Sequence, residues 1–165
     1  VNSYSNNMTA NQALADDWFR SIGATGWYNN TYAGGIYMED STWVRVYNNK
    51  QFYVNNKAKA QSWQEFYTAK SGTSVTIDAD TSGAFSLSMS GNTTFTFSAV
   101  DSGTSVGFIL QLTGNGSTVT WPSSVKWAGG TAPDAPASGE TDLYVFWTRD
   151  GGTTWYGVQS IDAAA

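Results

Sequence analysis

Apolar and polar residues alternate one by one along much of the second half of this 165-residue chain. A period of two indicates β-strands that are buried on one face only. The alternating apolar positions are Val75 and Ile77, then Phe85, Leu87 and Met89, then Phe95 and Phe97. Residues 106–112 are more continuously apolar, so there we expect a strand that is covered on both faces.

Shorter apolar segments continue this pattern toward the C-terminus, and Gly-rich turns separate them. These segments are residues 118–121, 125–127, 143–148 and 154–159. About eight short strands joined by such turns predict a β-sandwich of jelly-roll type.

Short aromatic segments replace this alternation in the first half of the chain. They are residues 18–19, 27–28, 35–38, 42–47 and 51–54, with turns that contain Gly, Asn or Asp between most of them. Short strands joined by tight turns are the natural interpretation, because Asn tolerates the left-handed conformations that such turns need. Residues 55–66 have some helical composition, and helix and irregular structure are equally open there. A short helix or an irregular segment is open for residues 6–15.

The sign of the net charge changes between the two halves. Residues 1–70 contain six Lys or Arg and five Asp or Glu, a net charge of +1, whereas residues 71–165 contain two and eight, a net charge of −6. The change falls at residues 69–73, a small polar stretch that is typical of a linker. We therefore predict an all-β protein with a neck module at 1–70 and a β-sandwich head module at 71–165.

Composition excludes several classes of function. The chain has no Cys and no His, which removes disulfides, the usual general base and the commonest metal ligand. A net charge of −5 argues against binding to nucleic acid or to an anionic membrane. No apolar run approaches the roughly 18 residues of a membrane helix, so we expect no membrane insertion. The N-terminus at Val1 shows no signal-peptide pattern, and we expect a piece of a longer polypeptide.

The most specific local motif is Thr148-Arg149-Asp150-Gly151-Gly152-Thr153-Thr154-Trp155. It resembles the Asp-box of sialidases, in which the Asp caps a β-turn, Gly supplies a positive φ and Trp packs beneath. The resemblance implies a structural turn formed by Asp150, Gly152, Thr154 and Trp155, remote from any catalytic site.

Pairs of acidic residues are the remaining candidates for catalysis or metal binding. The pairs are Asp16-Asp17, Glu39-Asp40, Asp78-Asp80 and Glu140-Asp142. Two carboxylates across a groove can hydrolyse a glycoside, and two carboxylates on alternate residues can join a Ca²⁺ site. Pairs so close in sequence more often cap turns or face solvent. We predict no catalytic residue, no metal site and no cofactor, and hence no enzyme.

Aromatic and turn residues are the candidates for ligand binding, because aromatic rings suit surfaces that are dry on one side and wet on the other. The longest non-periodic segment of the head module is residues 126–142, whose two prolines limit its freedom. Its candidate binding residues are Trp127, Asp134, Glu140 and Asp142. The alternative for Trp127 is a place in the core. The neck offers a second candidate turn with Tyr28, Asn29 and Tyr32.

Residues 23–45 resemble a segment of the tail fibres of tailed bacteriophages and prophages. The shared pattern is Gly-x-x-Gly-Trp-Tyr, then Thr-Tyr and a glycine run, then Asp-Ser-x-Trp-Val-Arg, with Ala33 in place of the first glycine of the run. Parts of residues 108–157 look like a C-terminal module of phage tail and virion proteins. The two likenesses together cover most of residues 17–160.

The resemblance implies a homotrimer with a short intertwined neck, at the tip of a virion tail fibre that folds in the host cytoplasm. The implied function is non-catalytic adhesion to a bacterial surface glycan, such as lipopolysaccharide or capsule, or to an outer-membrane protein. The alternatives are a polysaccharide depolymerase and a structural fibre cap without a receptor. The aromatic composition and the short strands also favour an oligomer, since subunits pair bare strand edges and bury aromatic surface.

Overall fold

The computed structural model describes residues 20–164, and the chain divides into two compact units, Val1–Ala60 and Gln61–Ala165. It is 2% helical and 43% strand, which confirms the all-β class. The division falls at residues 60/61, whereas the charge pattern predicts 70/71, because Tyr67–Lys70 is a strand of the second unit's sheet.

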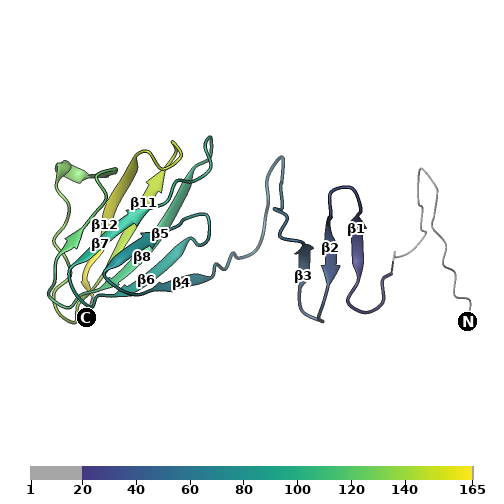
Figure 1. Cartoon of the computed structure of the whole chain (residues 1–165), viewed down its shortest axis with the longest axis horizontal. Helices are drawn as coiled ribbons and strands as arrows, with labels where there is room; N and C mark the ends of the chain where they lie inside the picture. Colours follow the sequence, from purple (N-terminus) through teal and green to yellow (C-terminus); the bar gives the residue numbers. More distant parts are fainter. Residues whose placement is uncertain (1–19, 165) are drawn as a thin grey trace, which may run out of the picture. The chain divides into compact units, whose positions relative to one another are not determined.

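The first unit contains a three-stranded antiparallel sheet in the order β1-β2-β3 (Figure 1). Its strands are β1 (Gly26–Asn29), β2 (Gly34–Met38) and β3 (Val44–Tyr47). In the turn between β2 and β3, the Asp40 carboxylate accepts hydrogen bonds from the backbone N–H groups of Thr42 and Trp43, at 2.8 and 3.0 Å. Asn48 and Asn49, directly after β3, have φ angles of 62° and 53°, the left-handed conformation that Asn tolerates.

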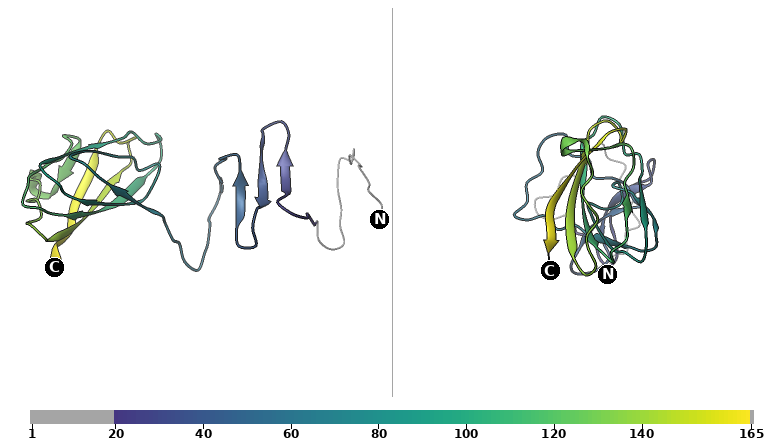
Figure 2. Two further views of the ribbon diagram at one scale, coloured as in Figure 1. Left: turned by 60° about the horizontal axis from the view of Figure 1, so that its bottom comes forward. Right: turned by 90° about the vertical axis from the view of Figure 1, so that its left-hand side faces the viewer.

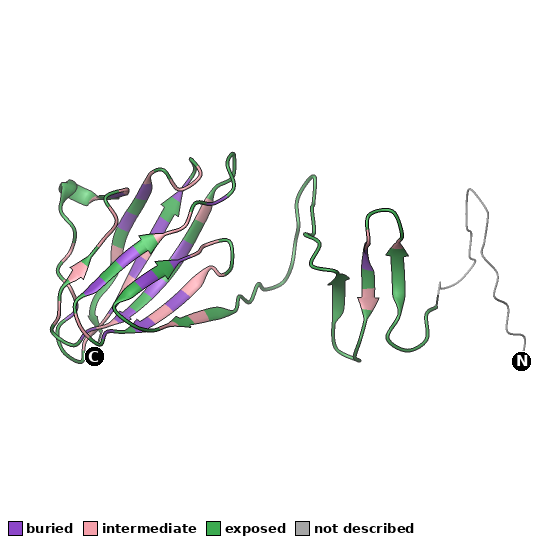
Figure 3. Cartoon of the chain, viewed as in Figure 1, coloured by how far each residue is buried: buried purple, intermediate pink, exposed green. Residues whose placement is uncertain are grey.

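This sheet has almost no hydrophobic core of its own. Within residues 20–60, Gly34 and Gly35 are the buried residues, and Figure 3 shows the three strands as largely exposed. Independent stability of a three-stranded sheet requires a buried apolar face. Residues 20–60 do not supply one.

For two segments of the first half of the chain, the sequence is compatible with either a helix or irregular structure. Residues 55–66 contain no helix and no strand. Residues 6–15 lie outside the described residues.

Two sheets, of six strands and of three, build the second unit (Figures 1 and 2). The six-stranded sheet has the order β10-β12-β11-β8-β6-β4, and the three-stranded sheet has the order β5-β7-β9. The elements are β4 (Tyr67–Lys70), β5 (Ser74–Ile77), β6 (Ala84–Ser88), β7 (Thr93–Phe97), β8 (Val106–Thr113), β9 (Val119–Thr120), β10 (Val125–Trp127), the short helix η1 (Ala128–Gly130), β11 (Thr141–Thr148) and β12 (Trp155–Ala164).

From β4 to β9 the chain alternates between the two sheets, so that neighbouring strands within each sheet run parallel. β4, β6 and β8 are parallel in the large sheet, as are β5, β7 and β9 in the small sheet. β11 and β12 then extend the large sheet as an antiparallel hairpin beside β8. This pairing departs from the predicted jelly roll, whose strands are antiparallel. The reason is that a period of two determines which face a side chain takes and carries no information on strand direction.

The hydrophobic core of the second unit combines side chains from both sheets. Its buried members are Val75, Ile77, Phe85, Leu87, Met89, Phe95, Val100, Phe108, Leu110, Leu112, Val125, Tyr144, Phe146 and Trp155. The alternating positions that the sequence predicts from Val75 to Phe95 all belong to this cluster, and Phe97 packs against it. Figure 3 shows the same alternation as buried and exposed bands along the strands. The predicted pattern is therefore confirmed.

The expectation that residues 106–112 form a strand covered on both faces is wrong. Phe108 and Leu110 are buried, but Ile109 between them is 48% exposed. β8 is an inner strand of the large sheet, paired on both sides, and its outward side chains have no covering element in the described part of the chain. A continuous apolar run in this sequence marks an apolar outer face instead of a second buried one.

Candidate functional site

Trp127, the predicted stacking residue, lies within an aromatic cluster of the second unit. Its ring centroid is 5.4 Å from that of Trp121, 5.6 Å from that of Phe146 and 6.2 Å from that of Tyr144. The side chain is half-buried and packs against the hydrophobic core. The structure therefore places Trp127 against the core, as in the alternative that the sequence left open.

Asp142 is buried, with 1% of its surface exposed, and does not lie on the surface. Its carboxylate accepts three hydrogen bonds, each at 2.9 Å, from the Tyr144 hydroxyl, the Gln159 side-chain amide and the backbone N–H of Ala163. Burial, with the adjacent Asp142 carboxylate, raises the pKa of the Tyr144 hydroxyl well above its usual value, so the hydroxyl stays a donor. This network connects β11 to the end of β12. The Asp142 carboxylate, which we predicted for ligand binding, is therefore already hydrogen-bonded within the protein.

The other two candidates of the second unit lie in the segment between η1 and β11. Asp134 is exposed, and its backbone carbonyl accepts a hydrogen bond from the Tyr144 hydroxyl at 3.4 Å. Glu140 is half-buried, and its carboxylate accepts a hydrogen bond from the backbone N–H of Ala137 at 3.3 Å. Asp134 thus presents its carboxylate to solvent, whereas Glu140 closes a local turn.

The candidate turn of the first unit connects β1 and β2. The Asn29 side chain accepts a hydrogen bond from the backbone N–H of Tyr32 at 2.9 Å and so stabilises this turn. The Tyr32 ring is largely exposed, and Tyr28 lies in β1, where it is half-exposed. These three residues remain predictions for a binding site.

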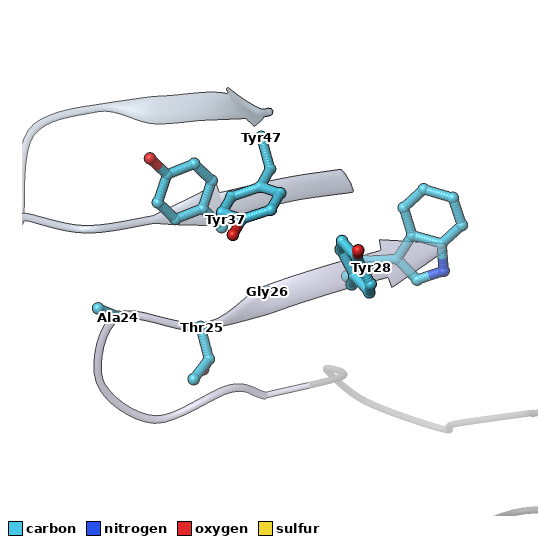
Figure 4. Close-up of a pocket in the computed structure, with 7 residues that line it drawn as sticks. Ala24, Thr25, Gly26, Tyr28, Tyr37 and Tyr47 are labelled. Carbon is cyan, nitrogen blue, oxygen red and sulfur yellow. The ribbon is translucent and has the colours of Figure 1, made fainter. Parts of the chain in front are cut away.

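A hollow of about 390 Å³ lies on the tyrosine-bearing face of the first unit (Figure 4). Tyr28 and Tyr47 flank Gly35 of the middle strand in register, and their rings meet edge to face at 5.6 Å. Tyr37 adds a second edge-to-face contact with Tyr47 at 5.3 Å. Tyr37 and Tyr47 lie in the predicted aromatic segments 35–38 and 42–47 but were not among the predicted binding residues.

The opposite face of the same sheet is apolar. Trp27, Ile36 and Val46 are directly aligned across β1, β2 and β3, and all three are exposed. They line a second hollow of about 280 Å³ together with Phe52 and Tyr32. The first unit therefore presents aromatic or apolar side chains on both faces of one thin sheet.

The Asp-box motif forms the turn between β11 and β12. The Asp150 carboxylate accepts hydrogen bonds at 2.9 Å from the backbone N–H of Thr154 and from the Thr148 hydroxyl. Gly151 and Gly152 have φ angles of 72° and 83°, which suit glycine, and Trp155 after the turn is buried. The hydrogen bond from Thr154, followed by that from Thr148, lowers the pKa of the Asp150 carboxyl.

Replacing Asp150 with alanine should lower the melting temperature of the protein, because the N–H of Thr154 loses its acceptor. The folded state favours the ionised carboxylate, so this stabilisation is present above the unfolded-state pKa of about 3.9 and is lost as the pH falls through the lower folded-state pKa. The difference in melting temperature between the parent and Asp150→Ala should therefore shrink in acid. The exposed neighbour provides the control Arg149→Ala, and an equal loss in that variant would contradict a capping role.

Carboxylate pairs elsewhere have structural partners. Arg45 forms ion pairs with both Glu39 and Asp40, and Asp40 also caps its turn. The Asp78 side chain accepts a hydrogen bond from the N–H of Asp80 at 3.2 Å, within a turn. Among residues 20–164, no group of three or more acidic side chains could hold a metal ion. Asp16 and Asp17 lie outside the described residues.

Within residues 20–164, no helix is long and apolar enough to cross a bilayer.

Comparison with known proteins gives the first half of the chain a family context. Residues 1–78, a little under half of the chain, match the family described as bacterial shufflon protein, N-terminal constant region. Shufflon proteins A' and B of Escherichia coli are each 38% identical to this chain over 55 residues, which is 32% of this chain. The chain spans only 13% and 12% of the length of these two relatives. No solved structure matches the chain significantly.

These findings overturn the tail-fibre interpretation. Residues 23–45, which carry the resemblance to phage fibres, lie inside the segment that matches the shufflon family. The location in a virion and the role in phage adsorption that followed from the resemblance are wrong, and the depolymerase and fibre-cap alternatives do not fit either. The physical reason is that the motif specifies a local structure, a thin sheet in which Tyr28 and Tyr47 meet over Gly35, and such a structure does not determine a function.

Proposed function

We propose that this chain is part of a shufflon-type protein of a conjugative pilus, and that its second unit recognises the surface of the recipient cell. The observation that carries the proposal is the family match of residues 1–78. Shufflon proteins are pilus-associated variable proteins with a role in recipient recognition during conjugation. The matched region is described as constant, and it ends directly after β5, so that β6 to β12 lie beyond it.

The architecture of the second unit suits such a recognition module. Its core is dense in aromatic contacts, with Phe97, Phe108, Phe146 and Trp155 packed against one another at 4.9 to 5.5 Å. A rigid scaffold of this kind presents turns that can change in sequence while the strands keep their places. The exposed Asp134 lies in the longest of these connections and stays our candidate for contact with the recipient surface.

The proposal includes a non-catalytic mode of binding without metal or cofactor. The chain has no Cys or His, so a Ser or Thr nucleophile would lack its usual activating base, and a general base would have to come from Asp, Glu, Lys or Tyr. The most buried carboxylate of the described core, Asp142, has its oxygens occupied by three donors. Recognition through surface contacts needs none of this chemistry.

A homotrimer also forms part of the proposal. The first unit presents Trp27, Ile36 and Val46 on one face and three tyrosines on the other, and its residues 20–60 bury almost nothing. Exposed apolar area of this kind marks an association surface. Closed cyclic assembly of three copies buries one such face of each sheet about a common axis and leaves no open end.

Light scattering on the purified full chain should give three times its mass of 17.8 kDa at micromolar concentration. The cause is burial of the aligned Trp27, Ile36 and Val46 in the assembly. Ile36→Asp should lower this mass, whereas Ser41→Asp, in an exposed turn of the same unit, should leave it unchanged. A mass of 17.8 kDa for the parent chain would contradict the assembly.

Binding to intact bacteria tests the proposed recognition. Fluorescently labelled chain should bind some strains of potential recipients and not others, in a saturable manner, and unlabelled chain should compete. Asp134→Ala should weaken this binding without changing the melting temperature, and Asp101→Ala, an exposed acid in a different loop, is the matched control. Binding to no strain, or equal and unsaturable binding to every strain, would overturn the proposal.

A further inference from the structure

The two outward faces of the second unit differ sharply in chemistry. The small sheet presents hydroxyl-bearing side chains, all exposed, at Ser74, Thr76, Thr94, Thr96 and Thr120. The large sheet presents exposed aromatic and aliphatic side chains at Tyr67 (70% exposed), Ile109 (48%), Trp147 (41%), Tyr156 (51%) and Val158 (52%). One face is therefore suited to water, and the other resembles the inside of a protein.

Strand register makes the apolar side chains contiguous. Tyr67, Ala84, Ile109, Val145 and Val158 are successive partners across β4, β6, β8, β11 and β12. Neighbouring strands are about 4.8 Å apart, so this row spans roughly 19 Å. Trp147 and Tyr156 form the next row, with ring centroids 6.0 Å apart. We call these seven residues the apolar sheet face. A patch of this extent covers on the order of several hundred Å², which is the size that marks interaction sites.

Acidic side chains are absent from this face although they are abundant on the unit. Residues 71–165 carry a net charge of −6, with eight acidic residues. Seven of these lie in turns, in connecting segments or near the end of β12, and the eighth, Asp142, points into the core. The outward positions of β4, β6, β8 and β11 are all uncharged, and the outward residue of the edge strand β10 is the basic Lys126, in register with Tyr156. Two identical units of the same negative charge can approach closely only through a surface from which the acids are missing.

We infer that the apolar sheet face is the contact between second units of neighbouring copies of this chain. The inference rests on the proposed homo-oligomer, in which the first units hold several copies together. Each second unit is connected to its first unit through the 19-residue segment between β3 and β4, so that assembly of the first units raises the local concentration of the second units. At this high local concentration, even a weak apolar contact between second units is formed in most assemblies. The threonine-lined face and the turns are left for the recipient surface.

The absence of cysteine makes a direct test possible, because a single introduced thiol is unambiguous. Ile109→Cys places a thiol at the centre of the apolar sheet face, and Thr96→Cys places one on the exposed face of the small sheet. The probe is a bulky maleimide fluorophore, applied to the full chain while light scattering reports its mass. In the oligomer we expect the thiol at position 109 to react about tenfold more slowly than the thiol at position 96. Val158→Cys should repeat the protection if Ile109→Cys folds poorly.

The outcomes separate this inference from the proposed oligomer. An oligomeric mass with a protected thiol at position 109 supports both. An oligomeric mass with equal reactivity at positions 109 and 96 overturns the contact between second units and leaves the oligomer intact. A monomeric mass overturns both.

Discussion

Replacing Gly35 with alanine should unfold the sheet of the first unit and dissolve the oligomer. A Cβ atom at this position would overlap the backbone carbonyl oxygen of Trp27 in the neighbouring strand, and backbone cannot yield as a flexible side chain can. The rings of Tyr28 and Tyr47 also meet across Gly35, which is their partner in both strand pairs. Relief of the overlap requires separation of β1 from β2, at a cost of about 3 kcal/mol or more. A sheet that buries so little cannot absorb this cost.

Near-ultraviolet circular dichroism reports on the tyrosine cluster, and light scattering reports on the mass. Both signals should fall toward those of an unassembled first unit in Gly35→Ala. The matched control is Gly91→Ala in the second unit, where an added Cβ would only touch the Thr73 side chain at 3.4 Å. Retention of the parent mass and spectrum by Gly35→Ala would show that the close approach of β1 and β2 does not hold the unit together.

Replacing Asp142 with alanine should destabilise the second unit more than any exposed substitution in it. Three donors, from Tyr144, Gln159 and Ala163, would lose this acceptor, and the hydroxyl of Tyr144 is the one that is buried. An unsatisfied buried polar group costs about 1–3 kcal/mol, so Asp142→Ala should cost about that much. The unfolding midpoint in urea should fall accordingly.

Two further variants serve as comparisons for Asp142→Ala. Tyr144→Phe removes one donor and leaves the carboxylate with the other two, so its loss of stability should be smaller. Asp134→Ala changes an exposed carboxylate in the preceding segment and should leave the midpoint unchanged. An unchanged midpoint for Asp142→Ala, combined with weakened binding to recipient cells, would return Asp142 to the binding residues that the sequence suggests.

The sequence predicts the inner face of the second unit well, because burial follows a period of two that can be counted. Phe85, Leu87 and Phe95 all lie where the alternation places them. The direction of strand pairing could not be predicted, since parallel and antiparallel neighbours bury the same positions. The role of Asp142 could not be predicted either: an acidic residue beside a turn looks solvent-exposed until the fold brings Gln159 and Ala163 to it.

The sequence also does not show which of its aromatic residues are buried and which are exposed. Trp127 and Trp147 are equally aromatic in the sequence, but one packs in the core and the other lies on the outer face of the large sheet. The difference comes from strand register, which local sequence does not reveal. The motif of residues 23–45 likewise reveals a thin sheet with Tyr28 and Tyr47 over Gly35, whereas the similarity to the shufflon family emerges from the longer match over residues 1–78.

The central claim, that the second unit recognises the recipient cell in conjugation, is tested most directly by competition in a mating mixture. Recipient cells are incubated with the purified full chain, washed, and mixed with donors whose pili carry the same protein; plasmid transfer is then counted. The account predicts that transfer falls in a saturable manner with the concentration of chain, and that incubation of the donors instead of the recipients has no effect. Unchanged transfer after incubation of the recipients, or an equal fall after incubation of either cell, would contradict it.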